Sequence, residues 1–196
     1  MKSVYNFVVK PIGKRYNNTT KIEGKDLILN TEIYSHKFVN RFAEVLSVPM
    51  VNNTNINIGD TVIVHHNVFR KWHNQYGIEK NSRSYFDENT YIINDDQIFL
   101  YKNNNEWRPL KGYCFVQPVK NTNFIDVDKE KPLIGIVKHT DGTVKKNDLV
   151  GFRPESKYEF IIEGKRLYRL LSNFITIKYE YQGNEEEYNP SWAQGG

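Results

Sequence analysis

The stretch Ile56-Asn57-Ile58-Gly59-Asp60-Thr61-Val62-Ile63-Val64 places the turn pair Gly59-Asp60 directly before a run of β-branched residues. A short apolar run that follows a turn is typical of a buried strand. The same pattern returns in Val144-Lys145-Lys146-Asn147-Asp148-Leu149-Val150-Gly151-Phe152. Asn147 stands where the first stretch has glycine, and because asparagine tolerates a positive φ, we expect the turn to survive. The two stretches predict one structural unit that occurs twice.

Further segments repeat in the same order and with similar spacing. Residues 6–12 correspond to 113–119, residues 91–93 to 168–170, and residues 98–100 to 175–177. Each segment is short, rich in β-branched and aromatic residues, and bounded by turn formers, which predicts strands. The alternative is one larger β-sandwich in which the similarity arose by chance.

The composition favours a folded, all-β protein. Of the 196 residues, 39% are hydrophobic and 14% aromatic, which is enough for a real core. Alanine, the best helix former, occurs only as Ala43 and Ala193. The abundance of Asn, Ile, Lys and Tyr is typical of an AT-rich genome, a phage genome included.

Composition shifts divide the chain into parts. We expect a first domain at residues 1–102, a polar, proline-containing linker at 103–111, a second domain at 112–181 and a tail at 182–196. An insertion at residues 67–87 enlarges the first domain. The residues expected in the first core are Val8, Val45, Val62, Val64, Ile98 and Leu100. Those expected in the second core are Phe115, Ile136, Leu149, Phe152, Leu170, Ile175 and Ile177.

The net charge and the hydropathy of the chain limit which partners we expect, whether nucleic acids, acidic molecules or membranes. A net charge of +4 permits a nucleic-acid or acidic partner without requiring one. No run reaches the ~18 apolar residues of a membrane span, and the N-terminus has no apolar signal core, so we expect a cytoplasmic protein without a membrane partner. The single cysteine, Cys114, has apolar neighbours and is expected to be a buried thiol.

The first half resembles the GroES-like co-chaperonin family over residues 5–101. Phe7-Val8-Val9-Lys10-Pro11 resembles the family's opening strand, and a polar loop then leads to the aliphatic tripeptide Leu27-Ile28-Leu29. Residues 41–48 resemble its "R-G-E-V-L-A-V-G" segment and residues 56–64 its "V-K-V-G-D-x-V-I-F" segment. Residues 91–100 resemble its closing hairpin. The second half, 112–181, resembles the same family, and two such domains in one chain also occur in the double co-chaperonins of chloroplasts.

The resemblance implies a fold of two tandem small GroES-like β-barrels and a function as a co-chaperonin. Such a protein caps a double-ring, ATP-dependent chaperonin of the GroEL type and assists protein folding through a mobile hydrophobic loop, here residues 13–30. The residues implied to bind the chaperonin are Leu27, Ile28 and Leu29. A second, weaker loop would use Phe124, Ile125 and Val127. If a phage encodes the protein, its location would be the cytoplasm of the host.

The loop also has a physical rationale. Residues 13–26 carry almost no large apolar side chains, so this segment cannot bury enough surface to fix itself. Burial of each aliphatic residue of the tripeptide in a partner's groove would contribute about 1.5–3 kcal/mol, against the entropy of ordering the loop. The alternative is that Leu27-Ile28-Leu29 is an ordinary core strand.

The resemblance also implies a homo-oligomeric ring, in which the first strand of one domain meets the last strand of its neighbour. Because the two halves carry unequal loops, we expect residues 1–101 to build most of the ring. The family's roof hairpin is reduced to residues 49–55 in the first half and to 140–143 in the second.

No catalytic or metal site is predicted. His65, His66 and His73 are close in sequence, but adjacent residues on a regular strand point to opposite faces, which argues against a shared ion. The chain has no nucleophile elbow and no glycine-rich phosphate cradle. We therefore expect a protein that is not an enzyme and that uses no cofactor.

Two other functions stay open. The fold could serve as a structural or assembly module, for example in a virus particle, because fold does not fix function. A β-barrel with exposed aromatic residues could instead bind single-stranded nucleic acid. The best basic and aromatic patch for that purpose is formed by Lys145, Lys146, Lys165, Arg166, Tyr168 and Arg169. The acidic run at residues 185–187 opposes it.

Overall fold

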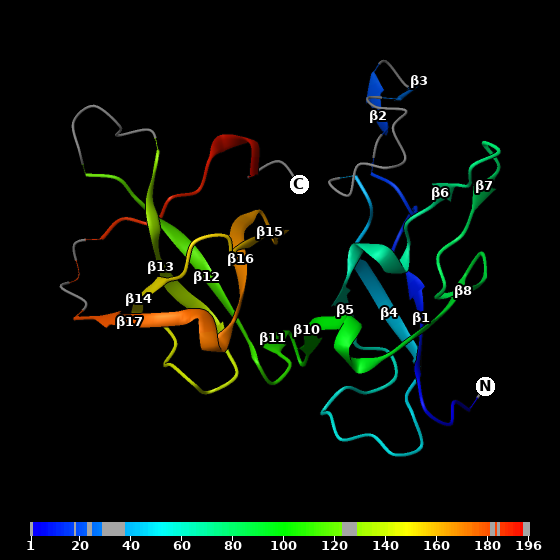
Figure 1. The fold of residues 1–196 in the computed structure, drawn as a ribbon, viewed down its shortest axis with the longest axis horizontal. Coiled ribbons are helices and arrows are strands. Elements are labelled where there is room, and N and C mark those ends of the chain that lie inside the picture. Colours follow the sequence, from blue (N-terminus) through cyan, green and yellow to red (C-terminus); the bar gives the residue numbers. More distant parts are fainter. Residues whose placement is uncertain are drawn as a thin grey trace. The chain divides into compact units, whose positions relative to one another are not determined.

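The computed structural model describes residues 2–17, 19–22, 25–28, 38–122, 129–180, 183 and 185–193 (Figure 1). Within these ranges the chain forms strands, turns and short 3-10 helices, and no α-helix. The predicted all-β class is therefore confirmed. Two compact units divide the chain, Met1–Glu106 and Trp107–Gly196.

The first large sheet has the strand order β11-β10-β5-β4-β1-β9-β8, and its edge strand β11 begins at Glu106, the last residue of the first unit. Its strands are β1 (Phe7–Pro11), β4 (Phe42–Ser47), β5 (Thr61–Val64), β8 (Tyr85–Asp87), β9 (Thr90–Ile93), β10 (Ile98–Asn103) and β11 (Glu106–Pro109). Two small hairpins form sheets of their own: β2 (Thr19–Ile22) with β3 (Lys25–Ile28), and β6 (Trp72–His73) with β7 (Glu79–Lys80). The 3-10 helices are η1 (His66–Val68) and η2 (Asp95–Gln97).

The second unit is built on a six-stranded sheet of order β15-β16-β12-β13-β14-β17. Its strands are β12 (Tyr113–Lys120), β13 (Glu130–Thr140), β14 (Leu149–Phe152), β15 (Tyr158–Ile162), β16 (Lys165–Leu171) and β17 (Ile175–Tyr179). Two 3-10 helices complete the unit, η3 (Ser172–Phe174) and η4 (Ser191–Ala193).

The two sheets have the same topology. The first sheet, read as β8-β9-β1-β4-β5-β10, matches the second, read as β15-β16-β12-β13-β14-β17, strand for strand. We call each set of six strands a module. The segments that repeat in the sequence fall on equivalent strands, so their predicted correspondence is confirmed.

The match extends to the register. Phe7, Val8 and Val9 pair with Ile93, Ile92 and Tyr91, just as Cys114, Phe115 and Val116 pair with Leu170, Arg169 and Tyr168. The first strand of each module also has a β-bulge at the same step, between Val8 and Val9 or between Phe115 and Val116. A bulge is a specific feature of a ladder, so its repetition argues for one structural unit used twice.

The turn that defined the repeat is also the same in both modules. Gly59 and Asn147 have φ angles of 89° and 70°, as the turn requires. The carboxylate of Asp60 accepts a hydrogen bond from the amide of Asn57 at 2.8 Å, and that of Asp148 accepts one from Lys145 at 2.9 Å. The expectation that asparagine replaces glycine at this turn is confirmed.

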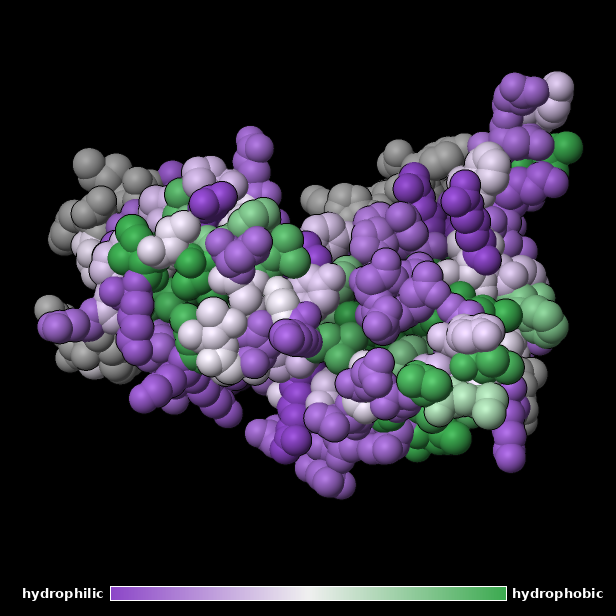
Figure 2. Space-filling model, turned by 60° about the horizontal axis from the view of Figure 1, so that its bottom comes forward, coloured by the Kyte–Doolittle hydropathy of each residue, from purple (hydrophilic) through white to green (hydrophobic). Residues whose placement is uncertain are grey.

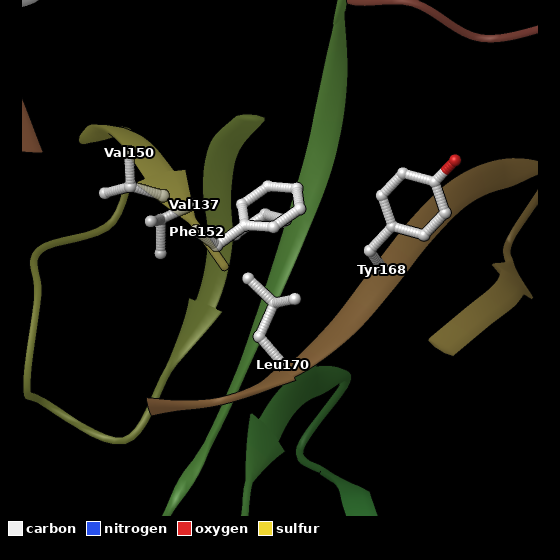
Figure 3. Close-up of a cluster of buried hydrophobic side chains, with 6 residues drawn as sticks. Val137, Val150, Phe152, Tyr168 and Leu170 are labelled. Atoms are coloured by element: carbon white, nitrogen blue, oxygen red, sulfur yellow. The ribbon is translucent and has the colours of Figure 1, made fainter. Parts of the chain in front are cut away.

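The predicted cores are largely confirmed. All six residues expected in the first core are buried, and so are five of the seven expected in the second. Figure 3 shows the main cluster of the second core, which Val137, Val150, Phe152, Tyr168 and Leu170 form with Val116. Ile175 is partly buried, but the prediction for Ile177 is wrong, since its side chain is 50% exposed.

The expected barrels are open sheets. The end strands of each sheet, β11 and β8 or β15 and β17, are not paired with each other among the described residues. Residues 103–111, expected as a linker, contain β11, which follows β10 through a two-residue turn. Asn104 and Asn105 both have a positive φ there, as a tight hairpin needs. Trp107 is buried and belongs to the second unit, where its indole nitrogen donates to Glu163 at 3.0 Å.

The insertion at residues 67–87 contains η1, the β6–β7 hairpin and β8. In the described part of the chain, no helix is long and apolar enough to cross a membrane.

Candidate functional site

The β2–β3 hairpin lies in the chain between β1 and β4, the first two strands of the first module. Leu27 and Ile28 belong to β3 and pair with Thr20 and Thr19. Within the described residues, the hairpin forms a two-stranded sheet that is separate from both large sheets. Leu29, the third residue of the tripeptide, lies outside the described residues.

The second module has a much shorter connection at the equivalent place. Between β12 and β13 there are only residues 121–129, compared with residues 12–41 in the first module. Phe124, Ile125 and Val127, the expected weaker loop, lie outside the described residues. The chain therefore carries a hairpin between the first two strands of one module and a short loop in the other.

In the basic patch expected to bind nucleic acid, the charge of Arg166 is neutralised by acidic side chains. Glu130 accepts hydrogen bonds from the Tyr168 hydroxyl at 2.6 Å, from Arg166 at 2.8 Å and from Lys157 at 2.6 Å. The Nε of Arg166 also donates to Glu159 at 2.7 Å. The Tyr168 side chain is buried, so it cannot stack on a base.

The electrostatics of this network follow from its contacts. Burial raises the pKa of the Glu130 carboxyl, but hydrogen bonds from Lys157 and Tyr168 and the charge of Arg166 outweigh burial and lower it overall. Burial and the hydrogen bond to Glu130 raise the pKa of Tyr168. The network holds a carboxylate, two cations and a neutral phenol together, which is an arrangement that stabilises the module.

The C-terminal tail packs against the second module. Lys120 donates its amide to the Glu186 carbonyl at 2.8 Å, and Tyr188 donates its amide to the Pro118 carbonyl at 2.8 Å. The side chain of Asn189 accepts from the Arg166 amide at 3.0 Å and donates to the Gly164 carbonyl at 2.9 Å.

The end of the tail continues this packing. The Arg166 guanidinium lies 5.0 Å from the Tyr168 ring and 5.6 Å from the Trp192 ring, and Ala193 is buried. The segment thus acts as a strap across the ends of β12 and β16, and we call residues 185–193 the strap.

No group of three or more potential metal ligands occurs among the described residues. The arrangement of His65 and His66 differs from the one expected. Strand β5 ends at Val64, and the rings of His65 and His66 stack with centroids 4.2 Å apart instead of pointing to opposite faces. The Nδ1 of His65 accepts a hydrogen bond from the Asn67 amide at 3.1 Å, which uses that nitrogen within the turn.

Cys114 is buried, as predicted. Its sulfur lies 3.4 Å from the Ser172 hydroxyl, which donates to Asp141 at 2.8 Å. Burial raises the pKa of Asp141, but hydrogen bonds from Thr143, Ser172 and the Gly112 amide outweigh it and lower the pKa overall. These groups satisfy one another, which is the pattern of a structural cluster.

Exposed apolar side chains occur near the N-terminus and in residues 49–55 of the first unit. Val4, Tyr5, Met50 and Val51 are each at least half exposed, and Met50 donates its amide to the Val4 carbonyl at 3.2 Å. Figure 2 shows apolar areas of this kind in green among hydrophilic side chains in purple. Apolar surface of this kind is available to a partner.

No known protein-family model matches the chain, and no curated protein matches it either. The function must therefore be argued from the modules, the hairpin and the surfaces described above.

Proposed function

We propose that this chain is a co-chaperonin, which caps a double-ring, ATP-dependent chaperonin of the GroEL type and assists protein folding. The observation that carries the proposal is the β2–β3 hairpin, a separate sheet between the first two strands of the first module. The family resemblance puts the chaperonin-binding loop at this point of the chain. Leu27 and Ile28 end the hairpin's second strand, and Leu29 follows them.

The repeated module supports the same proposal. Two modules with one strand order, one register and one bulge position form a tandem repeat, and a tandem repeat is what the resemblance to double co-chaperonins implies. The finer assignment, that each of these open sheets corresponds to a GroES-like barrel, is part of the proposal.

The unequal connections support a division of labour between the modules. Only residues 121–129 join β12 to β13, so this loop has a shorter reach than residues 12–41. We propose that the first module supplies the main contact to the chaperonin through Leu27, Ile28 and Leu29. Phe124, Ile125 and Val127 would supply a weaker one.

A binding assay with matched variants tests this proposal. We expect the triple change of Leu27, Ile28 and Leu29 to serine to abolish co-precipitation with a GroEL-type chaperonin in the presence of ATP, because an apolar groove gains nothing from serine. The matched control changes Phe124, Ile125 and Val127 to serine and should reduce binding only slightly. Circular dichroism should show the same β spectrum for both variants. Undiminished binding by the first variant would refute the loop assignment.

The edges of the two large sheets indicate how the chain could form a homo-oligomer. The outer edge of β10 is paired with β11, whereas β17 ends its sheet and exposes Ile177 and Tyr179. An open strand edge pairs readily with another chain. This supports a homo-oligomer to which the second module contributes an edge, in contrast to the ring expected mainly from residues 1–101. Mass measurement by light scattering tests it, because a charge in the middle of β17, such as Ile177→Lys, should then reduce the oligomer to smaller species.

The same edge would also serve the alternative function of a structural or assembly module, for example in a virus particle. The chaperonin assay separates the two functions. A wild-type chain that forms oligomers but does not bind the chaperonin in ATP would favour the assembly module.

A further inference from the structure

The first unit contains a cavity that the proposed co-chaperonin function does not use. Its volume is about 450 Å³, within the range of small-molecule sites. The cavity lies where the insertion meets η2 of the module, and its lining includes Arg70, Trp72 and Arg83 from the insertion and Gln97 from η2. The second unit has no such insertion, so the cavity is a property of the first unit.

The walls of the cavity are held by hydrogen bonds. Ser82 donates its hydroxyl to the Val68 carbonyl at 2.6 Å, and the Trp72 indole nitrogen donates to the Asn81 carbonyl at 3.2 Å. The Ile92 amide donates to the Ser84 carbonyl at 2.7 Å, which ties the wall to β9. The indole ring is therefore held in place by its own nitrogen, and a fixed ring is suited to stacking.

The charge of the cavity is positive and uncompensated. No acid is among the lining residues, and neither Arg70 nor Arg83 forms an ion pair among the described residues. The Nε of Arg70 is buried without a hydrogen-bond partner. The nearby acids Asp95 and Asp96 line a different cavity.

Arg166 in the second unit is different, because two carboxylates, those of Glu130 and Glu159, lie within 2.8 Å of its guanidinium. Two arginines that share a cavity without a carboxylate are instead suited to an anionic ligand, because a guanidinium fork matches the oxygens of a phosphate group.

We propose that this cavity binds a nucleotide unit. Arg70 and Arg83 would hold the phosphate, and the Trp72 ring would stack on the base, as aromatic side chains do in single-strand binding proteins. The side-chain amide of Asn67, which also lines the cavity, offers a donor and an acceptor to the edge of a base. A simple carboxylate would use the arginines but leave the indole and this amide without a role.

Calorimetry on the full chain tests the site with three probes: AMP, inorganic phosphate and adenosine. We expect AMP to bind at least tenfold more tightly than either part alone, because both ends of the cavity then contribute. The double variant Arg70→Gln with Arg83→Gln should weaken AMP binding at least tenfold. The variant Trp72→Leu should weaken AMP binding about tenfold and leave the affinity for phosphate unchanged.

A matched control removes a positive charge at Lys80, which lies on the β6–β7 hairpin with Trp72 but does not line the cavity. Lys80→Gln should change AMP affinity less than twofold, and all variants should keep the wild-type β spectrum. A labelled oligoadenylate of twelve residues distinguishes the source of the nucleotide unit. Tighter, strongly salt-dependent binding of the oligomer identifies a nucleic-acid strand, whereas equal affinity for AMP and the oligomer identifies a free mononucleotide.

Three results would overturn the proposal: no AMP binding at millimolar concentration, equal affinities for AMP and phosphate, or unchanged AMP affinity in the double arginine variant. Because the two assays change different residues, Leu27, Ile28 and Leu29 in one and Arg70 with Arg83 in the other, chaperonin binding and AMP binding can fail independently.

Discussion

The two units use one module but complete it in different ways, and the tyrosine that both modules share shows this best. Tyr91 and Tyr168 occupy the same position, opposite the bulged first strand. In the first unit, Phe69 of the insertion packs against Tyr91 with ring centroids 4.7 Å apart, and Arg15 lies 5.5 Å from the ring. In the second unit, Arg166 lies against Tyr168 and is covered by the C-terminal strap.

The surroundings of the two tyrosines differ in polarity. The hydroxyl of Tyr91 is buried without a hydrogen-bond partner, and burial raises its pKa to about 12. The hydroxyl of Tyr168 donates to Glu130 instead. An internal insertion thus closes the first module with apolar contacts, while a terminal segment and a charged network close the second.

The sheet edges differ as well. Leu100 on β10 is fully buried, whereas its equivalent Ile177 on β17 is half exposed. The chain after β10 turns back to form β11, while the chain after β17 leads to the strap. Where the chain goes after the last strand therefore decides whether the same sheet position is core or surface.

The largest effect is expected from removal of the strap. A chain that ends at residue 184 loses two backbone hydrogen bonds, both bonds of the Asn189 side chain and the burial of Ala193. At about 1 kcal/mol for each hydrogen bond, we expect the free energy of unfolding of the second unit to fall by about 3–5 kcal/mol. Hydrogen exchange of β12 and β16 should report the loss, while β1 and β9 stay protected.

A chain that ends at residue 193 keeps the described strap and serves as the control. If both truncations leave the exchange of β12 unchanged, the strap is not what completes the second module.

A decrease of intermediate size in the stability of the second unit is expected when the pH is lowered. Because its pKa is lowered in the folded state, Glu130 contributes stability that is present above its ordinary pKa of 4.5 and is lost as the pH falls through the folded value. Asp141 acts in the same direction from 3.8. In the first unit, hydrogen bonding to Lys71 lowers the pKa of Glu79, but this side chain is 48% exposed and such surface pairs contribute little.

We therefore expect acid to loosen the second unit first, with NMR signals of β12 and β16 losing dispersion below pH 4.5 before those of β1 and β9. The variant Glu130→Gln should destabilise the second unit by about 1.5–3 kcal/mol at pH 7 and flatten this dependence. Simultaneous loss of both sets of signals would show that the charged network does not distinguish the units.

Much of the fold could be predicted because its signals are local. A turn followed by an apolar run identifies β5 and β14, and the equivalence of Gly59 and Asn147 follows from the backbone they share. The exposure of Ile177 could not be predicted from its equivalence to Leu100. Burial at this position depends on a strand beyond the last one of the module, and β10 has such a neighbour in β11, whereas β17 ends its sheet.

The candidate sites were less predictable. The tripeptide follows from the family resemblance and from the polarity of the segment before it, and its third residue, Leu29, lies outside the described residues. The cavity of Arg70, Trp72 and Arg83 has no glycine-rich motif and combines residues of the insertion with Gln97 of η2. One signal was present in the sequence, since residues 67–78 contain two basic residues and a tryptophan but no acid.

The smallest effect is expected from exchanging the turn residues, and it tests the equivalence of the modules most directly. At φ 89°, a side chain on Gly59 would meet no atom within 4 Å, so only backbone strain opposes it. Asparagine tolerates this region, and it also restricts the unfolded chain, which offsets part of the strain. We expect Gly59→Asn to cost less than about 1 kcal/mol and Gly59→Ala to cost more, because alanine lacks asparagine's tolerance of a positive φ.

The reverse change, Asn147→Gly, should shift stability by less than about 0.5 kcal/mol, since relief of strain is balanced by a more flexible unfolded state. Denaturant unfolding of the three variants measures these values. In both turns the residue at positive φ donates its amide to the valine carbonyl of the neighbouring strand, Gly59 to Val45 and Asn147 to Val137, each at 2.8 Å. Because that bond does not depend on the side chain, a cost above about 2 kcal/mol for Gly59→Asn would mean that the two turns are not interchangeable.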